Sequence, residues 1–504
     1  MTSTQETMDK KEAPTSKKPK KRVRLEAAFK DLSMTLLWVL FAACLLSATY
    51  GYNIWLIYSP SVLIKDFYNV TTFPPKMNPN IKLFLMSSSI ALYPLGGTFG
   101  ALLIGVLEDR CGRKGTLIIT NVLSILSAVL MGCTHEVTTY EFKMVARLVT
   151  GICSGIIYSA VPIYIGEISP VELRGCITMT ANFFFSIGVL LAQTLALREV
   201  LGNERGWPIL MCFAGVMPAC QVFLLPFIPE SPRYLYIQKK DEDGAREALQ
   251  MLRGREDVED EMDELREEFF AAKAEKPLNT PKLLWKRSLR WQVITVITLM
   301  ASQHLTGVIA TYYYSERTYI YTHMGKDNVR FMSIATTVSF CLANIFSMFL
   351  VDSVGRKILL LSGFGICGIL CVVLAITVEL QDTISEMAYF STVFILLFLL
   401  AQCIGPNSTP CLIVLELFLQ TSRASGFVIA GFVHWFMNFV SGVLFYHTEK
   451  SIGSYCFLLY FPICLATFLF ILKFLPETKK RTFVDIKRIM LLRSVKKVSA
   501  TVVD

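Results

Sequence analysis

The chain is 504 residues long, 53% of them hydrophobic and only 18% charged, with a formal net charge of +9. Soluble globular domains carry about 25% charged residues, so this composition excludes an ordinary soluble protein and indicates one whose solvent is lipid. No Gly-rich loop of the GxxxxGK[ST] type occurs. The sequence therefore predicts no nucleotide ligand and no direct use of ATP.

The first 32 residues are rich in Lys, Pro, Ser and Thr and contain a basic run at 17–24. They have no apolar signal-peptide core, and we expect this segment to be disordered. Because basic residues beside a membrane span favour the cytoplasmic side, the run predicts a cytoplasmic N-terminus. A nucleic-acid-binding role for the run conflicts with the spans that follow, so no nucleic-acid partner is expected.

Apolar stretches of about 20 residues, the length that crosses a bilayer, recur twelve times. They lie near 34–57, 84–107, 116–133, 144–165, 176–197, 207–228, 292–314, 330–351, 358–379, 388–415, 425–446 and 453–474. The sequence thus predicts an all-α membrane protein. Its expected parts are the disordered basic segment 1–32, a six-helix half at 33–228, cytoplasmic linker helices at 229–290, a second six-helix half at 291–476 and a cytoplasmic tail at 477–504.

Charged signatures at the ends of these spans occur twice, in the same order, once in each half. This duplication is typical of transporters built from two homologous halves. Opposite charges at one membrane level predict ion-pair networks that close a cytoplasmic gate, and static stapling of helix ends is the alternative. The predicted network consists of Asp109, Arg110, Arg113, Arg147, Glu167, Arg174, Glu230, Asp352, Arg356, Glu416, Arg423 and Glu477.

An even number of spans returns the C-terminus to the cytoplasmic side, so we expect a multi-pass plasma-membrane protein with both termini inside. The net charge then reflects topology and contact with anionic inner-leaflet lipids. The loop after the first span is expected outside, where Asn69-Val-Thr71 forms a glycosylation sequon. A second match at Asn407 falls within a span, where glycosylation is not expected.

Neutral polar residues occupy the middle of several spans, and they suit an uncharged, hydroxylated solute. The tenth span is also broken by Gly405, Pro406 and Pro410, and irregular backbone within a membrane is tolerated beside a cavity. Helix–helix hydrogen bonding is the alternative for any single residue. The residues that we expect in a substrate path include Asn182, Gln303, His304, Asn407, His434, Trp435 and Asn438.

The first span contains no carboxylate, and proton relays in membranes normally use one. The sequence therefore predicts facilitated diffusion, with a proton-coupled symporter that uses His304 or His434 as the alternative. The 14 cysteines form no CxxC pair and no Cys/His cluster with metal-ligand spacing. We expect no metal, no cofactor and no enzymatic activity.

Several motifs between about residues 33 and 485 occur together. They are Gly105-x-x-x-Asp109-Arg110-x-Gly112-Arg113-Lys114, Arg147, Pro229-Glu-Ser-Pro-Arg233, Gln303-x-Leu-Thr-Gly307, Asp352-x-x-Gly-Arg-Lys357, Gly405-Pro406 and Pro476-Glu-Thr-Lys479. With this set the chain resembles the sugar porters of the major facilitator superfamily, and among them the animal facilitative glucose/fructose transporters (solute carrier family 2). The resemblance implies the major facilitator fold and a hexose substrate.

The resemblance also implies roles for single residues and a branch of the family. Cys411 stands where glucose-preferring members have tryptophan, and the pair His434-Trp435 is similar to the fructose-transporter-like branch. Tyr50 matches a sugar-contacting tyrosine. Asn53 replaces the aspartate of proton-coupled relatives. The implied substrate-binding set is Tyr50, Asn182, Gln303, His304, Asn407, Cys411, His434, Trp435 and Asn438, with Tyr313 and Tyr314 as the outer gate.

Four positions depart from the family pattern: Asn182 and His304 replace glutamines, and Ile309 and Phe340 replace asparagines. Two lost amides imply a drier, narrower site and a weaker hold on hexose. The best hypothesis is uniport of a hexose, with fructose favoured, by alternating access. Transport of another small polar solute such as urate, and a non-transporting sugar receptor or sensor, remain alternatives.

Overall fold

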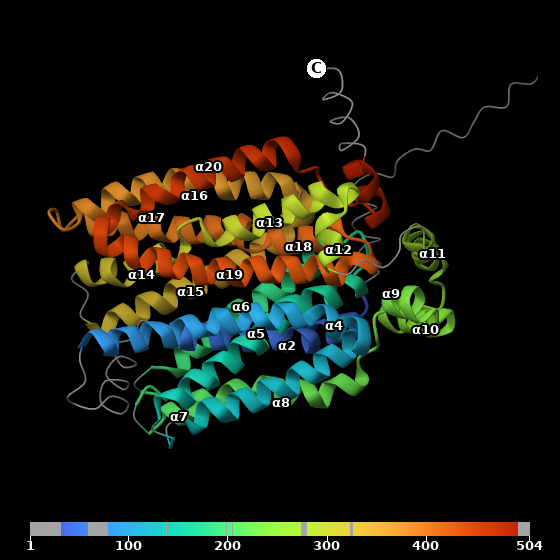
Figure 1. Ribbon diagram of the computed structural model, residues 1–504, viewed down its shortest axis with the longest axis horizontal. Helices are drawn as coiled ribbons and strands as arrows, with labels where there is room; N and C mark the ends of the chain where they lie inside the picture. Colours follow the sequence, from blue (N-terminus) through green and yellow to red (C-terminus); the bar gives the residue numbers. More distant parts are fainter. Residues whose placement is uncertain are drawn as a thin grey trace, which may run out of the picture.

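The chain folds into a bundle of long helices, described by a computed structural model for residues 32–58 and 79–491, apart from 135, 138, 198, 204, 274–279 and 323–325 (Figure 1). No strand occurs among these residues. The helices of the first half are α2 Met34–Tyr58, α4 Pro79–Cys133, α5 Tyr140–Ile168, α6 Arg174–Leu195, α7 Trp207–Cys212, η1 Phe213–Gly215, α8 Val216–Leu224 and η2 Leu225–Phe227.

Short helices follow between the halves: α9 Pro232–Tyr234, η3 Leu235–Lys239, α10 Glu242–Arg253, α11 Glu259–Lys273 and α12 Thr280–Trp285. The second half contains η4 Arg287–Leu289, α13 Arg290–His304, α14 Val308–Tyr321, α15 Lys326–Val354, α16 Arg356–Leu380, α17 Met387–Gln402, η5 Cys403–Asn407, α18 Thr409–Leu417, α19 Gln420–Ile452, η6 Gly453–Cys456 and α20 Phe457–Phe474. A last helix covers 483–491.

Twelve crossings of the membrane are confirmed, although only ten continuous stretches among the described residues are long and apolar enough to span it. Two of them, Ala91–Cys133 with 43 residues and Gln420–Phe474 with 55, are each about twice the length that one crossing needs. Each contains a glycine with positive φ, Gly112 at 74° and Gly453 at 55°. The chain therefore turns back at these glycines, and each stretch supplies two spans.

Two spans are interrupted where the sequence has Gly and Pro. The seventh span breaks between α13 and α14, where Gly307 has a φ of 92°. The tenth span passes from α17 into the π-helical turn η5, which contains Pro406, and then into α18. Both interruptions lie in the second half, and residues beside each of them form the second site described below.

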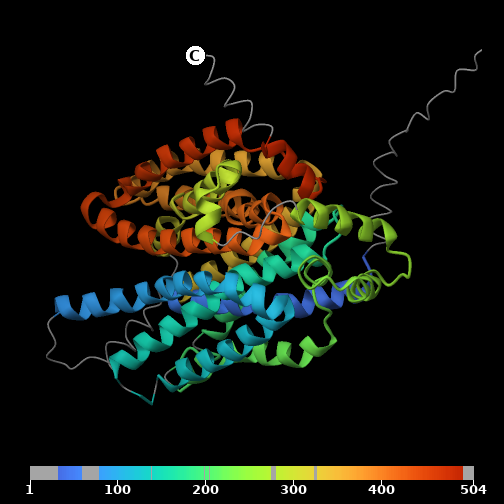
Figure 2. The same ribbon diagram turned by 45° about the vertical axis from the view of Figure 1, so that its right-hand side comes forward.

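The two halves lie side by side as two layers along the length of the bundle, and α9, α10 and α11 lie at one end of it (Figures 1 and 2). We call this end the linker end. One large apolar core contains residues of both halves, of the linker and of the last helix, for example Ile163, Leu252, Leu412 and Ile486. Two other apolar cores are each confined to a single half. The halves are therefore packed together most continuously at the linker end.

Helices α4 and α5 pack so closely that glycine is required at their contact. A Cβ atom built on Gly151 would lie 2.1 Å from the backbone oxygen of Tyr93, and one on Gly155 would lie 2.2 Å from the oxygen of Gly97. Small residues at such spacing let helix backbones approach within a membrane, where dispersion contacts drive association. This contact aligns α4 and α5, which carry the charged residues at the linker end.

Gly151→Ala should lower the thermal stability of the purified protein, because the added methyl group forces two backbones apart. We expect a loss of about 1–3 kcal/mol, the usual cost of overpacking. Gly442→Ala is the matched control, since a Cβ atom at Gly442 meets nothing within 4 Å. The measurement is thermal unfolding in detergent, and equal melting temperatures for the two variants would contradict this account of the α4–α5 contact.

Candidate functional site

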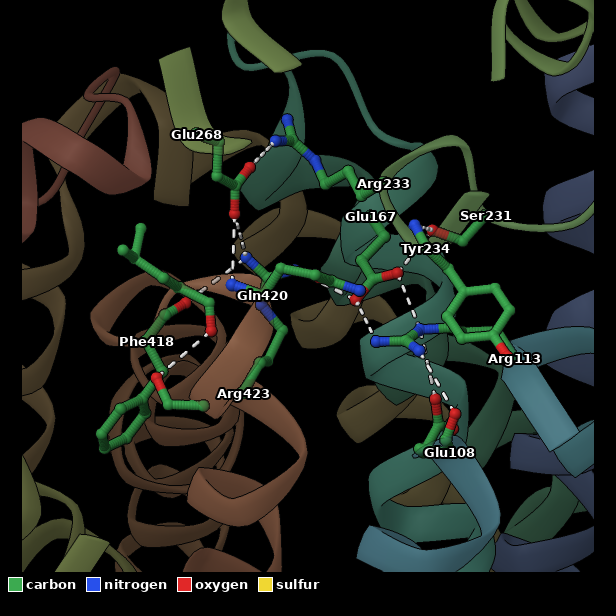
Figure 3. Close-up of polar contacts among 12 residues, drawn as sticks. Glu108, Arg113, Glu167, Ser231, Arg233, Tyr234, Glu268, Phe418, Gln420 and Arg423 are labelled. Atoms are coloured by element: carbon green, nitrogen blue, oxygen red, sulfur yellow. Dashed lines mark hydrogen bonds and ion pairs between the residues drawn. The ribbon is translucent and has the colours of Figure 1, made fainter. Parts of the chain in front are cut away.

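A buried charged cluster lies at the linker end, where the two halves meet (Figure 3). Its centre is Glu167, near the end of α5 and only 3% exposed. Arg113 of α4 donates to both oxygens of Glu167, from Nε at 2.9 Å and from Nη2 at 3.0 Å. Arg423 of α19 donates from Nη1 at 3.0 Å, and the hydroxyl of Ser231 donates at 2.5 Å. One carboxylate thus joins guanidinium groups from opposite halves.

Arg113 also meets a second buried carboxylate, Glu108, which the sequence prediction did not include. Its Nε lies 3.3 Å from Oε2 of Glu108, and both side chains are fully buried. Within the part of the chain that the structure describes, neither oxygen of Glu108 accepts a hydrogen bond. The sequence instead predicts its neighbours Asp109 and Arg110 in the network, but both are exposed. They were predicted from their charge, but α4 stays helical to Gly112 and buries Glu108 in their place.

The second half repeats this arrangement with its own residues. Arg356 contacts Asp352 from Nη1 and Glu416 from Nη2, both at 2.8 Å. Asp352 also accepts a hydrogen bond at 2.6 Å from the backbone N–H of Cys176, which belongs to the first half. The pair Arg423–Glu167 and the pair Cys176–Asp352 therefore both cross between the halves. A sequence can reveal the duplicated charges, but it does not show which of them meet across the interface.

The chain bends at Gly112, inside α4, and at Gly355, between α15 and α16. Glu230 and Glu477 hold these two kinks in the same way. Glu230 accepts the backbone N–H groups of residues 113 and 114 at 3.1–3.2 Å, and Glu477 accepts those of residues 356 and 357 at 3.0–3.1 Å. Gly112 and Gly355 have φ values of 74° and 109° and leave room for these carboxylates, since a Cβ on either would lie 2.6 Å from a carboxylate oxygen. Burial raises the pKa of Glu230, and the backbone donors counteract that effect.

Two carboxylates of the linker helix α11 complete the cluster, and the sequence prediction missed both. Arg233 forms ion pairs with Glu264 at 2.9 Å and with Glu268, and Glu268 lies 3.4 Å from Nη2 of Arg423. Arg174 lies 3.7 Å from Glu264. Burial by itself would raise the pKa of Glu264, but Arg233 and Arg174 outweigh burial and hold that pKa below its ordinary value. Glu264 therefore stays ionised and neutralises part of the cluster.

The ring of Phe483, at the start of the last helix, lies among three of these guanidinium groups. Its centre is 3.9 Å from the guanidinium carbon of Arg174, 4.3 Å from that of Arg423 and 4.8 Å from that of Arg233. Cation–π contacts contribute about 0.5–2 kcal/mol each, and more when water is excluded. Phe483 is itself 2% exposed. The tail, the linker and both halves therefore meet at one point.

Arg147 was predicted in this network, and that prediction is wrong. It lies on α5 twenty residues before Glu167 (167 − 147), which places it about 30 Å away along the helix axis at 1.5 Å per residue. The side chain is buried near the other end of α5. Because α5 runs from Tyr140 to Ile168 with Glu167 at the linker end, Arg147 belongs to the opposite end of this span.

A second candidate site lies in the middle of the bundle, where the broken helices meet α19. Nε2 of Gln303 donates to the backbone oxygen of Asn407 at 3.0 Å and to its Oδ1 at 3.2 Å. Oε1 of the same amide lies 3.2 Å from Nδ1 of His434. That Nδ1 is also 3.0 Å from Nε2 of His304. Four of the predicted substrate-binding residues thus form one chain of hydrogen bonds.

Aromatic rings cover this chain on the side of the first half. Trp435 is fully buried and packs edge-on against Tyr50, Tyr93 and Tyr158, and Tyr158 stacks on His434 with ring centres 3.9 Å apart. Nε1 of Trp435 and Nε2 of His434 are both buried, and neither has a hydrogen-bond partner among the described residues. Unpaired polar atoms cost free energy when buried, so these two atoms are candidates for hydrogen bonds to a bound solute.

The remaining predicted substrate residues are not part of this chain of hydrogen bonds. Asn182 is half-buried on α6, and its amide contacts Met179 of the same helix. Cys411 and Asn438 are buried, at 9% and 7% exposure. Ile309, one of the four departures from the family pattern, packs against the apolar core of the second half.

The predicted outer-gate tyrosines lie on α14, beyond the break in the seventh span. Their rings are 5.3 Å apart, and both pack on Phe445. Tyr314 is fully buried, whereas Tyr313 is 47% exposed and contacts Glu449 at 3.5 Å. The predicted glycosylation site, Asn69, lies outside the described residues.

Comparison with known proteins finds a family and relatives that match most of this chain. The family described as "Sugar (and other) transporter" matches residues 39–490. The mouse solute carrier family 2, facilitated glucose transporter member 5 is 42% identical over 469 residues, 92% of this chain and 93% of the relative. Human member 7 is 41% identical over 467 residues, 92% and 91% of the two chains.

The fold agrees with a solved structure. The proton:xylose symporter XylE, of the major facilitator superfamily and bound to 6-bromo-6-deoxy-D-glucose, superposes with a TM-score of 0.80 at 20% identity, over 91% of this chain and 100% of that one. At that identity the likeness concerns the fold alone. The matched length and the identity to the two transporters decide the family: this chain belongs to the sugar transporter family, within solute carrier family 2.

Proposed function

We propose that this protein carries a hexose across the plasma membrane as a uniporter, with fructose favoured, by alternating access. The observation that carries the proposal is the pairing of two features. A buried polar site with two unpartnered atoms lies between the halves, and the halves are joined at the linker end by ion pairs that cross between them. The relatives named as facilitated glucose transporters support the same substrate class.

In this proposal the linker end faces the cytoplasm, together with both termini. The exposed basic residues near that end, such as Arg110, Lys282 and Arg287, support this orientation because Lys and Arg are retained on the cytoplasmic side of spans. The charged cluster is then the cytoplasmic gate. Breaking it would open the site inward, while Tyr313 would close it outward.

The gate needs to be strong enough to close and weak enough to open. Removing one partner of a buried ion pair costs about 3–5 kcal/mol, because the other charge is left without compensation. Opening by a rocking motion separates Arg423 from Glu167 but lets water reach both. As the ion pair breaks, water solvates both charges and offsets the lost attraction. The free-energy difference between the closed and open states therefore stays small.

The chain should move hexose down its gradient without an ion. In proteoliposomes we expect saturable uptake of labelled fructose, weaker uptake of glucose, and rates that do not change when the proton gradient is collapsed. Labelled urate belongs in the same panel, because the aromatic rings gathered at Tyr158, His434 and Trp435 would also suit a flat heteroaromatic solute. Saturable urate flux without hexose flux, or no saturable flux of any of the three, would overturn the hexose proposal.

Arg113→Ala should reduce transport at least tenfold while the protein still reaches the surface, since the variant leaves Glu108 and Glu167 buried without their shared partner. Arg488→Ala is the matched control: Arg488 is 65% exposed, and its ion pair with Glu267 at 3.4 Å is open to water. Uptake and surface labelling are measured together. Normal flux in Arg113→Ala would mean that the cluster only staples helix ends.

A further inference from the structure

The chain of hydrogen bonds at the central site has a fixed direction, because one of its ends can act in one way only. The backbone oxygen of Asn407 is an acceptor, so the atom of Gln303 that lies 3.0 Å from it must be the amide nitrogen. The other terminal atom of Gln303 is then the oxygen, and it faces Nδ1 of His434 at 3.2 Å. Reversing the amide would set oxygen against oxygen at Asn407.

The direction continues through the two histidines. Since Oε1 of Gln303 can only accept, Nδ1 of His434 must carry the proton. Nε2 of His304, 3.0 Å from the same Nδ1, then accepts the second branch of that hydrogen bond. A neutral imidazole has one protonated nitrogen, so Nε2 of His434 is left as a bare acceptor. This is the buried atom that has no partner in the structure.

We infer that Gln303 and His304 act as positioning residues that hold His434 in a single tautomer, so that the central site presents an acceptor at His434 Nε2 and a donor at Trp435 Nε1. The inference rests on the proposed function for the identity of the solute, but the tautomer itself follows from the geometry alone. The histidine that replaces a family glutamine at 304 thus works through His434 instead of binding the solute directly.

This polarity selects a chemical class of solute. A solute must place an O–H or N–H donor at His434 and an acceptor at the indole N–H of Trp435, and the hydroxyl groups of a sugar can do both. A group that only accepts, such as a carboxylate or a fluorine, would meet the bare nitrogen with like polarity. Tyr158 stacks on His434 with ring centres 3.9 Å apart, and this contact supports the plane of the imidazole.

The direct test is nitrogen NMR of the full-length protein labelled with ¹⁵N-histidine, in nanodiscs. The chain has only five histidines, and the signals of His434 are assigned by their loss in His434→Gln. We expect a protonated Nδ1 and a bare Nε2. A protonated Nε2, or rapid averaging between the two forms, would overturn the inference whether or not the protein transports sugar.

Variants separate positioning from packing. His304→Leu leaves Oε1 of Gln303 as the acceptor for Nδ1, so His434 should keep its tautomer in that variant. Gln303→Leu removes the group that sets the direction of the chain, so the two histidines can exchange donor and acceptor and the His434 signals should average. The double variant removes both acceptors, and we expect its His434 signals to average. An unchanged, fixed tautomer in a double variant that still folds, as judged by its thermal unfolding, would mean that neither residue positions the ring.

Transport supplies the second test. Deoxyfluoro hexoses lose one donor at a time, and inhibition of uptake by this series should fall about two- to tenfold at the position that meets His434, the worth of one neutral hydrogen bond. His434→Gln presents an amide that can turn to offer a donor, so the same fluorine should cost less there. If that penalty is unchanged in His434→Gln, the solute does not donate to His434.

Discussion

Glu167 is shared by two arginines that belong to different halves of the molecule, and the linker end is organised around that shared carboxylate. Arg113 holds one half to it and Arg423 the other. Each of the three side chains is at most 3% exposed, so water cannot take over for a missing partner. The kinks at Gly112 and Gly355, the carboxylates of α11 and the ring of Phe483 all serve to bring these charges together and to neutralise them.

In a uniporter such a contact must form when the linker end closes and break when it opens. The apolar core that spans both halves lies largely at the linker end, whereas the other large cores stay within one half. The two halves can therefore separate there only by losing packing and by wetting the ion pairs. At the centre the constraint is of another kind, because the hydrogen bonds from Asn407 to His434 lie within the second half. The site's polarity can then persist while the halves rock, so that the same acceptor and donor meet the solute from either side.

The sequence was sufficient for the fold and for part of the site, and the residues show why. Apolar length alone located all twelve spans, and the duplicated charges identified Arg113, Glu167, Arg356, Glu416 and Arg423. Burial could not be inferred for Glu108, because helix α4 continues through a run that looks like a charged loop. Glu264 and Glu268 stand in a solvated acidic helix whose inward face depends on tertiary packing. Tertiary packing also decides that His304 meets His434, 130 residues away, and where Phe483 lies. The charge of Arg147 does not reveal its level in the membrane, which depends on the direction in which α5 crosses.

The central claim is that the carboxylate of Glu167 holds the two halves together at the linker end. It is tested most directly by the distance between spin labels incorporated at the exposed positions Arg110 and Val354, one in each half, measured by pulsed electron resonance in nanodiscs. The account predicts one dominant short distance in the native protein and a substantial longer population in Glu167→Gln, whose neutral amide cannot bridge two guanidinium groups. Identical distance distributions in the two proteins would contradict it.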